Sequence, residues 1–307
     1  MSRASQTNSP RGGPRSQQPE WLTPLGRSIH GPTPPGGATP CERISALDTH
    51  EVREVVELIA KARVGRTSAV LPPRLRTRHW ASVEGVVLAL DERLGWDGYG
   101  WKVGAASAEI RRAEGLPSPS PGRIYSRGVA QSPAVLGSEL FINYRQCECE
   151  FAFELGLDYP ARSRPWSEAD ARAGIASLLP VIEIGDCVFE DWYGASAYFG
   201  TSLDNGGGAA FVEGKRCAEW SDINLKVAPM HVYLDGYYVK SGVGAAAMGD
   251  PVTSLTWLMN WLREHGRGLA AGELVSTGTC TGHLFTQPGD TVRADFEELG
   301  IVEVSFL

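Results

Sequence analysis

The 307-residue sequence has no apolar run near the roughly 20 residues that a helix needs to cross a bilayer. Its N-terminus also lacks the continuous apolar segment of a secretory signal. Acidic residues outnumber basic ones, and the net charge of −7 argues against a nucleic-acid partner, because phosphate binding requires a basic surface. These absences predict a cytoplasmic protein that binds neither membranes nor nucleic acids.

Cysteine is scarce as well: the six residues of the whole chain are too few for a dense disulfide framework at this length. Cys147 and Cys149 form a C-x-C pair, but no His or Cys pair follows at the spacing of a zinc finger. We therefore interpret the cysteines as reduced residues of the core.

The remaining composition, with 42% hydrophobic and 21% charged residues, is typical of a globular protein with a substantial core. Residues 1–45 differ, because they are rich in Pro, Gly, Ser, Arg and Gln and have few large apolar side chains to offset the entropy lost on ordering. We expect a disordered or loosely docked tail at 1–45, a small helical lobe at 46–98 and a strand-rich domain at 99–307.

Apolar residues at helical spacing predict helices that begin near Asp48 and that span 80–94, 167–179 and 250–266. Most of the chain beyond the first two helices has the pattern of strands. The predicted strands are 100–104, 139–144, 147–157, 180–188, 208–214, 224–236, 237–242, 274–279, 291–296 and 301–306. The expected fold class is α+β with a mixed, strand-rich core.

The segment RQCECEFAFELGL (145–157) raises the question of function, because an otherwise apolar strand begins with two acids. Alternation places the cysteines, the phenylalanines and Leu155 on one face, and Glu148, Glu150 and Glu154 on the other. Taken alone, this pattern is typical of a half-buried strand with one solvated acidic face.

Glu183 is harder to explain in that way, because it lies inside the apolar strand LLPVIEIG, where an unneutralised carboxylate is costly. One explanation is a salt bridge to Lys or Arg. The other is a divalent cation shared with Glu148 and Glu150, since carboxylates suit Mg²⁺ or Mn²⁺. Lys102, in the predicted strand GWKVG, either pairs with a buried acid or lies near a metal-bound substrate, where it can move protons.

Seven segments occur in a recognisable order. They are GWKVG, E-C-E followed by FAFELGLDYP, LLPVIEIGD, LDNGGGAAFVEG, VKSGVGAAAMGDPVTSLTWL, LAAGELVSTGTCTG and QPGDTVRADFEELGIVEVSF. Together they resemble the fumarylacetoacetate hydrolase superfamily, and more closely its 2-keto-4-pentenoate hydratase/4-oxalocrotonate decarboxylase branch. The resemblance covers about residues 48–307, so 99–307 would be the catalytic domain.

The resemblance implies a mixed β-roll core and a Mg²⁺ or Mn²⁺ ion held by Glu148, Glu150 and Glu183. It also implies a 2-oxo or 2-hydroxy-alkenoic acid as substrate, whose enolate the cation stabilises. From that enolate, either water adds to a conjugated alkene or a carboxylate leaves as CO₂.

Other site residues also follow from the resemblance. Lys102 and Asp204 are the candidate proton carriers. The candidate substrate-binding residues are Asn205, Thr277, Thr279 and His283.

Acylpyruvate and fumarylacetoacetate hydrolases usually have an aspartate as third ligand and a His–Glu pair that activates water. Glu183, and the lack of a clear His–Glu pair before the E-x-E, favour the hydratase/decarboxylase branch. The chain departs from that branch at Arg127, near a position where an acid is common. Arg123 and Arg127 could therefore pair with a second substrate carboxylate, although exposed arginines are the simpler reading.

A C–C hydrolase of acylpyruvates and a non-catalytic partner subunit stay as alternative functions. The resemblance further implies a homo-oligomer, with possible association with a related pathway enzyme.

Overall fold

A computed structural model describes residues 45–192 and 198–307 of the chain. The tail predicted at 1–45 therefore lies outside the described residues, apart from Ser45. Six α-helices occur in the described ranges: α1 Thr49–Gly65, α2 Trp80–Leu94, α3 Ala108–Glu114, α4 Glu168–Ala173, α5 Gly200–Leu203 and α6 Pro251–Glu264. None of the described helices is long and apolar enough to cross a membrane.

The strands form two sheets. The larger sheet has the order β2-β1-β10-β5-β6-β7-β3, with β11 also pairing with β5. Its strands are β1 Gly98–Gly104, β2 Ser120–Tyr125, β3 Val129–Gln131, β5 Gln146–Leu155, β6 Ile175–Gly185, β7 Gly208–Glu213, β10 Leu274–Ser276 and β11 Leu284–Phe285.

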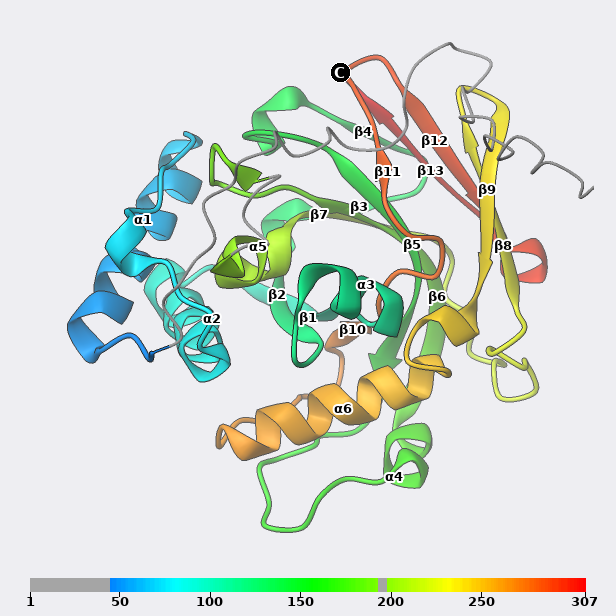
Figure 1. The fold of residues 1–307 in the computed structure, drawn as a ribbon. Coiled ribbons are helices and arrows are strands. Elements are labelled where there is room, and N and C mark those ends of the chain that lie inside the picture. The colour runs from blue at the N-terminus through cyan, green and yellow to red at the C-terminus, as the bar shows by residue number, and fades with distance from the viewer. Residues whose placement is uncertain (1–44, 193–197) are drawn as a thin grey trace, which may run out of the picture.

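The smaller sheet has the order β4-β13-β12-β8-β9. Its strands are β4 Ala134–Leu136, β8 Pro229–Leu234, β9 Tyr237–Val243, β12 Thr291–Asp295 and β13 Ile301–Phe306. Figure 1 shows this sheet at one side of the molecule, with α1 and α2 together at the other side and α6 running below the larger sheet.

The main hydrophobic core lies against one face of the larger sheet. Cys147, Phe151 and Phe153 of β5 belong to it, as do Val232 of the smaller sheet and Leu258 of α6. The acidic residues of β5 alternate with these positions and therefore point to the opposite face. The alternation predicted for 147–157 is confirmed, and it leaves one face of the sheet for a functional site.

The cysteines of the described residues follow the prediction. Cys147, Cys149, Cys187 and Cys280 are buried and Cys217 is half-buried, and all five are free thiols. The sixth, Cys41, lies outside the described residues.

The two N-terminal helices pack on a second hydrophobic cluster. Val55 and Ile59 of α1 and Leu90 of α2 meet Phe189 and Tyr198, which come from the segment after β6. A capping box at the start of α1, in which Asp48 and Glu51 bond each other's backbone N–H groups, fixes where this helix begins. The helical lobe therefore shares its core with a segment of the strand-rich part, and the domain boundary near residue 98 stays a prediction.

Two predicted elements are wrong. Residues 139–144 form no strand, because the backbone N–H groups of Ile142, Asn143 and Tyr144 donate to the carboxylate of Asp186 rather than to a neighbouring strand. The helix predicted at 167–179 ends at Ala173, and β6 begins at Ile175. The apolar residues after Gly174 gain more from pairing with β5 inside the core than from continuing a short helix.

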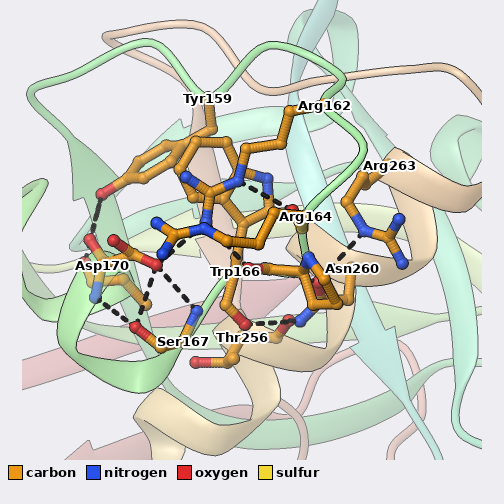
Figure 2. Close-up of polar contacts among 11 residues, drawn as sticks. Tyr159, Arg162, Arg164, Trp166, Ser167, Asp170, Thr256, Asn260 and Arg263 are labelled. Atoms are coloured by element: carbon orange, nitrogen blue, oxygen red, sulfur yellow. Dashed lines mark hydrogen bonds and ion pairs between the residues drawn. The ribbon is translucent and has the colours of Figure 1, made fainter.

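The loop between β5 and α4 is held on α6 by a polar network (Figure 2). Trp166 N donates to Asn260 Oδ1 at 2.8 Å, and Asn260 Nδ2 donates back to Trp166 O at 2.9 Å. The Arg162 guanidinium lies 3.2 Å from the centroid of the Trp166 ring and bonds Asp170 at 3.0 Å. These contacts fasten the loop without using any of the carboxylates predicted to form the site.

Candidate active site

Glu148 and Glu183 face each other directly across the antiparallel pair β5–β6. Glu148 Oε1 accepts a hydrogen bond from Gln146 Nε2 at 2.6 Å. Directly opposed like charges are destabilising in a sheet unless something neutralises them. The pair therefore requires a positive group or bound cation beside it.

Lys102 supplies one positive charge. It lies on β1 with its side chain on the same face, because its neighbours Trp101 and Val103 belong to the main core. Its Nζ donates to Glu183 Oε1 at 2.6 Å and to the carbonyl of Gly206 at 2.5 Å. Lys102 and Glu183 are each about 5% exposed or less, so this is a buried ion pair.

Glu150 is the third carboxylate and is almost completely buried. Its Oε2 accepts from Ser276 Oγ at 2.5 Å and from the backbone N–H of Gly278 at 2.9 Å. Ser276 escaped the sequence analysis, although it occupies the register position beside Lys102 in β10.

Burial and like charges disfavour the ionised forms of Glu150 and Glu183. Burial raises the pKa of Glu150 well above its usual range, and repulsion from Glu183 and Glu148 raises it further. Burial also raises the pKa of Glu183, against the opposing effect of Lys102, and Glu148 adds to the increase. A divalent cation would remove this penalty.

A cavity of about 310 Å³ opens beside the carboxylates. Its polar part includes Lys102, Glu148, Glu183, Gln146 and His283. Its remaining walls are mixed. Glu114, Ser120, Thr201 and Ser202 are polar, and the large apolar or aromatic side chains are Ile110, Leu116, Tyr144, Trp192, Phe199 and Phe285. A concave space that combines aromatic walls with convergent polar groups is typical of a small-molecule site.

His283 lines this cavity, as predicted for a substrate-binding residue, with Nε2 at 3.6 Å from Glu148 Oε1. Glu114, at the end of α3, lines it too. Burial raises the pKa of Glu114, and Glu148 adds to the increase while His283 opposes it. No feature of the sequence pointed to Glu114.

Asp204 and Asn205 are placed differently from the prediction. Asp204 is fully buried, receives Arg63 Nε at 2.6 Å and accepts the N–H of Val188 at 2.7 Å. Asn205 exchanges hydrogen bonds with the backbone N–H and C=O of Arg123, at 2.7 and 2.9 Å. Neither side chain lines the cavity, and both fasten the loop before β7. Their roles in catalysis and substrate binding stay predictions.

The two threonines differ from each other. The Thr277 hydroxyl is buried and donates to Phe151 O at 2.7 Å, and Thr277 does not line the cavity, so its substrate-binding role stays a prediction. The Thr279 hydroxyl is buried and has no hydrogen-bond partner among the described residues. A substrate-binding role for Thr279 stays a prediction.

The arginines predicted to meet a second carboxylate line a smaller cavity of about 80 Å³, and Lys102 and Glu183 line this cavity too. Arg123 bonds Glu273 at 2.6 Å and lies over the ring of Trp101. Arg127 lies 4.2 Å from the centroid of the Trp96 ring.

The donor set fits a hard divalent cation, because it is buried, made of oxygen and more negative than Lys102 alone can balance. In the described residues no three His, Cys, Asp or Glu side chains converge on one point closely enough to hold an ion. Glu150 is drawn to Ser276 and Gly278, and Glu183 to Lys102. The chemistry of the residues therefore fits the metal, while their side chains are turned toward protein partners.

The fold is of the α+β class, with a curled sheet that carries a buried acidic site on one face. Residues 136–306 match the model of the Fumarylacetoacetate (FAA) hydrolase C-terminal family. The chain is 30% identical over 210 residues to 2-keto-4-pentenoate hydratase of Paraburkholderia phymatum, with 67% of this chain and 77% of the hydratase covered. The chain belongs to the fumarylacetoacetate hydrolase family.

Further similarity comes from the decarboxylases. The chain is 28% identical over 138 residues to 4-oxalocrotonate decarboxylase of Pseudomonas putida, with 45% of this chain and 52% of that enzyme covered. The structure of 4-oxalocrotonate decarboxylase from Pseudomonas putida G7, solved with calcium and acetate, aligns with a TM-score of 0.74 at 23% identity. This alignment covers 85% of this chain and 99% of the decarboxylase, which was also solved with magnesium and adipate. The predicted fold class and family resemblance are confirmed.

Proposed function

We propose that this protein is a divalent-metal-dependent lyase, a hydratase or decarboxylase of a short 2-oxo or 2-hydroxy-alkenoic acid. The observation that carries the proposal is the opposed pair Glu148–Glu183 with Lys102 at its side, at the polar end of a cavity. Relatives named as hydratases and decarboxylases support this reaction class.

Glu148, Glu150 and Glu183 are the residues that would hold the cation, Mg²⁺ or Mn²⁺. When bound, it would supply Lewis-acid stabilisation of the enolate of a 2-oxo acid. The structures of the decarboxylase with calcium and with magnesium support a divalent ion.

The chain's own residues supply the proton transfers. Lys102 Nζ lies between Glu183 and the Gly206 carbonyl, which fix its position at the cavity wall. It can give a proton to a carbanionic carbon and recover it from an attacking water. His283, beside Glu148, is a second candidate proton carrier that lines the cavity, besides Asp204.

The test is calorimetric titration of the full chain with Mg²⁺, with and without oxalate, a planar mimic of the enolate. We expect Mg²⁺ binding that oxalate tightens and that Glu150→Gln weakens by at least about tenfold, as loss of one charged ligand implies. Binding that oxalate leaves unchanged, or that survives Glu150→Gln, would refute the metal site.

One observation favours the alternative of a C–C hydrolase of acylpyruvates. His283 and Glu114 line the same cavity beside Glu148, and a His–Glu pair can activate water for such a cleavage. Release of pyruvate from an acylpyruvate, with no turnover of 2-hydroxypentadienoate, would establish this alternative. A role as a non-catalytic partner subunit would require that neither substrate reacts.

Homo-oligomerisation and association with a related pathway enzyme stay predictions of the resemblance. Cytoplasmic location and the absence of nucleic-acid and membrane partners stay predictions from the composition and charge of the sequence.

A further inference from the structure

We propose that the aromatic end of the cavity is a subsite for a bulky apolar or aryl substituent on the substrate. The substrate would then be a 2-oxo acid with one carboxylate and an apolar far end, rather than a dicarboxylic acid. This inference rests on the proposed function, because it places the 2-oxo acid head at the carboxylates and Lys102.

Three of the rings that line the cavity form a continuous wall. The Tyr144 and Trp192 ring centroids are 4.1 Å apart, Trp192 and Phe285 are stacked at 5.5 Å, and Tyr144 and Phe285 are 5.7 Å apart. All three side chains are half-buried and line the cavity. Rings already packed on each other lose little freedom when they bind a further ring.

The distance along the chain fits an extended substrate. Phe285 of β11 pairs with Gln146 of β5, whose side chain bonds Glu148. Tyr144 precedes Glu148 by four residues, which corresponds to at most about 13 Å of extended backbone. The aromatic wall therefore begins next to the acidic end of the cavity.

The volume also exceeds the need of a short acid. A cavity of about 150 Å³ is enough to hold benzene in a protein core. The cavity of about 310 Å³ is roughly twice that size, so it has room for an acidic head and for a six-membered ring.

The charges of the lining disfavour a second carboxylate. Within the described part of the chain, Lys102 is the one Lys or Arg that lines this cavity, and it is already paired with Glu183. Glu114 and Glu148 would repel a second carboxylate. Arg123 and Arg127 line the smaller cavity of about 80 Å³.

The test compares saturated 2-oxo acids, which cannot be hydrated, by calorimetry in the presence of Mg²⁺. We expect 4-phenyl-2-oxobutanoate to bind at least about tenfold more tightly than 2-oxobutanoate, and 2-oxoadipate to bind no more tightly than 2-oxobutanoate. Equal binding of the first two acids would overturn the proposal. Tightest binding of 2-oxoadipate would overturn it too, and would direct the second carboxylate to the arginines.

Variants locate the effect. Phe285→Ala should abolish most of the preference for the phenyl compound and leave the affinity for oxalate within about twofold. Phe285→Leu, which keeps the apolar volume, serves if the alanine variant does not fold, and it should lose part of the preference. Tyr237→Ala, on the exposed surface of β9, is the matched control and should change neither affinity.

Oxalate separates the two levels of failure. Oxalate binding without a phenyl preference would reject the aromatic subsite and leave the proposed function intact. Absence of oxalate binding would reject the proposed function and the subsite together.

Discussion

The Lys102 ammonium lies 2.6 Å from the Glu183 carboxylate, although β10 and β5 separate their strands in the sheet. Such a contact requires a strongly curled sheet, and β10, with only three residues, leaves little backbone between them. The ion pair therefore depends on the curl of the sheet, and it also balances one negative charge of the acidic site.

Replacing Lys102 by methionine should destabilise the metal-free protein. Breaking a buried pair leaves a carboxylate without compensation, at a cost of about 3–5 kcal/mol. Mg²⁺ should recover part of the loss. Denaturant unfolding in EDTA and in Mg²⁺ would measure both effects, with Lys61→Met on the exposed side of α1 as control. A loss in Lys102→Met no larger than in the control would contradict the prediction.

The pH dependence of stability should have an unusual sign in the absence of metal. The pKa values of Glu150 and Glu183 lie above the usual glutamate value of 4.5, so the folded state binds more protons than the unfolded state. Their contribution to stability is full below about pH 4.5 and is lost as the pH rises through the raised values.

Unfolding experiments in EDTA between pH 5 and 8 would test this sign. The free energy of unfolding of Glu150→Gln should fall less with rising pH than that of the natural protein. Glu298→Gln, at an exposed position, should keep the natural slope. Mg²⁺ should stabilise more strongly at the higher pH, because ligands must lose their protons to bind it.

Asp204→Asn should damage the fold rather than the chemistry. The Arg63–Asp204 pair is buried, and neutralising one partner should cost about 3 kcal/mol of unfolding free energy. The affinity for oxalate in Mg²⁺ should change by less than about twofold, since Asp204 does not line the cavity. Unchanged stability with a loss of turnover above about a hundredfold would instead restore Asp204 as a proton carrier.

The loop held by Arg162 gives a prediction away from the site. Hydrogen bonds from Ser167, followed by that from Arg162, lower the pKa of Asp170 from 3.8 to about 2. Their contribution is present above pH 3.8 and is lost as the pH falls toward 2. Arg162→Ala should raise this pKa toward 3.8 in a carboxylate NMR titration and leave oxalate binding unchanged. An unmoved pKa would mean that the Ser167 cap alone holds the carboxylate.

The acidic site was predictable because period-two alternation directly assigns faces. Glu148 and Glu150 fall on the face opposite Cys147 and Cys149 in the sequence pattern and in the structure. Glu183 was conspicuous because a carboxylate inside an apolar strand needs a partner, and Lys102 is that partner. Glu183 therefore forms the buried salt bridge and is also a candidate metal ligand, so the two explanations do not exclude each other.

The contacts of side chains in loops could not be predicted from the sequence. Asp204 and Asn205 are polar residues of a glycine-rich turn, and only the structure shows that Arg63 and the backbone of Arg123 bind their side chains. The aromatic wall joins Tyr144, Trp192 and Phe285 from three separate segments, and no local pattern links them. The helix predicted at 167–179 failed because pairing with β5 outweighed helical spacing.

The two faces of β5 link the stability of the core to the position of the acidic groups, which a site built on loops would not do. Phe151 and Phe153 anchor the strand in the core, while Glu148 and Glu150, on the same short run of backbone, carry the acidic groups. A substitution that loosens the phenylalanine side would shift the carboxylates by the same movement. Variants selected for a tighter interior should thus also hold the ion more firmly, and ageing or heat should erode both properties together.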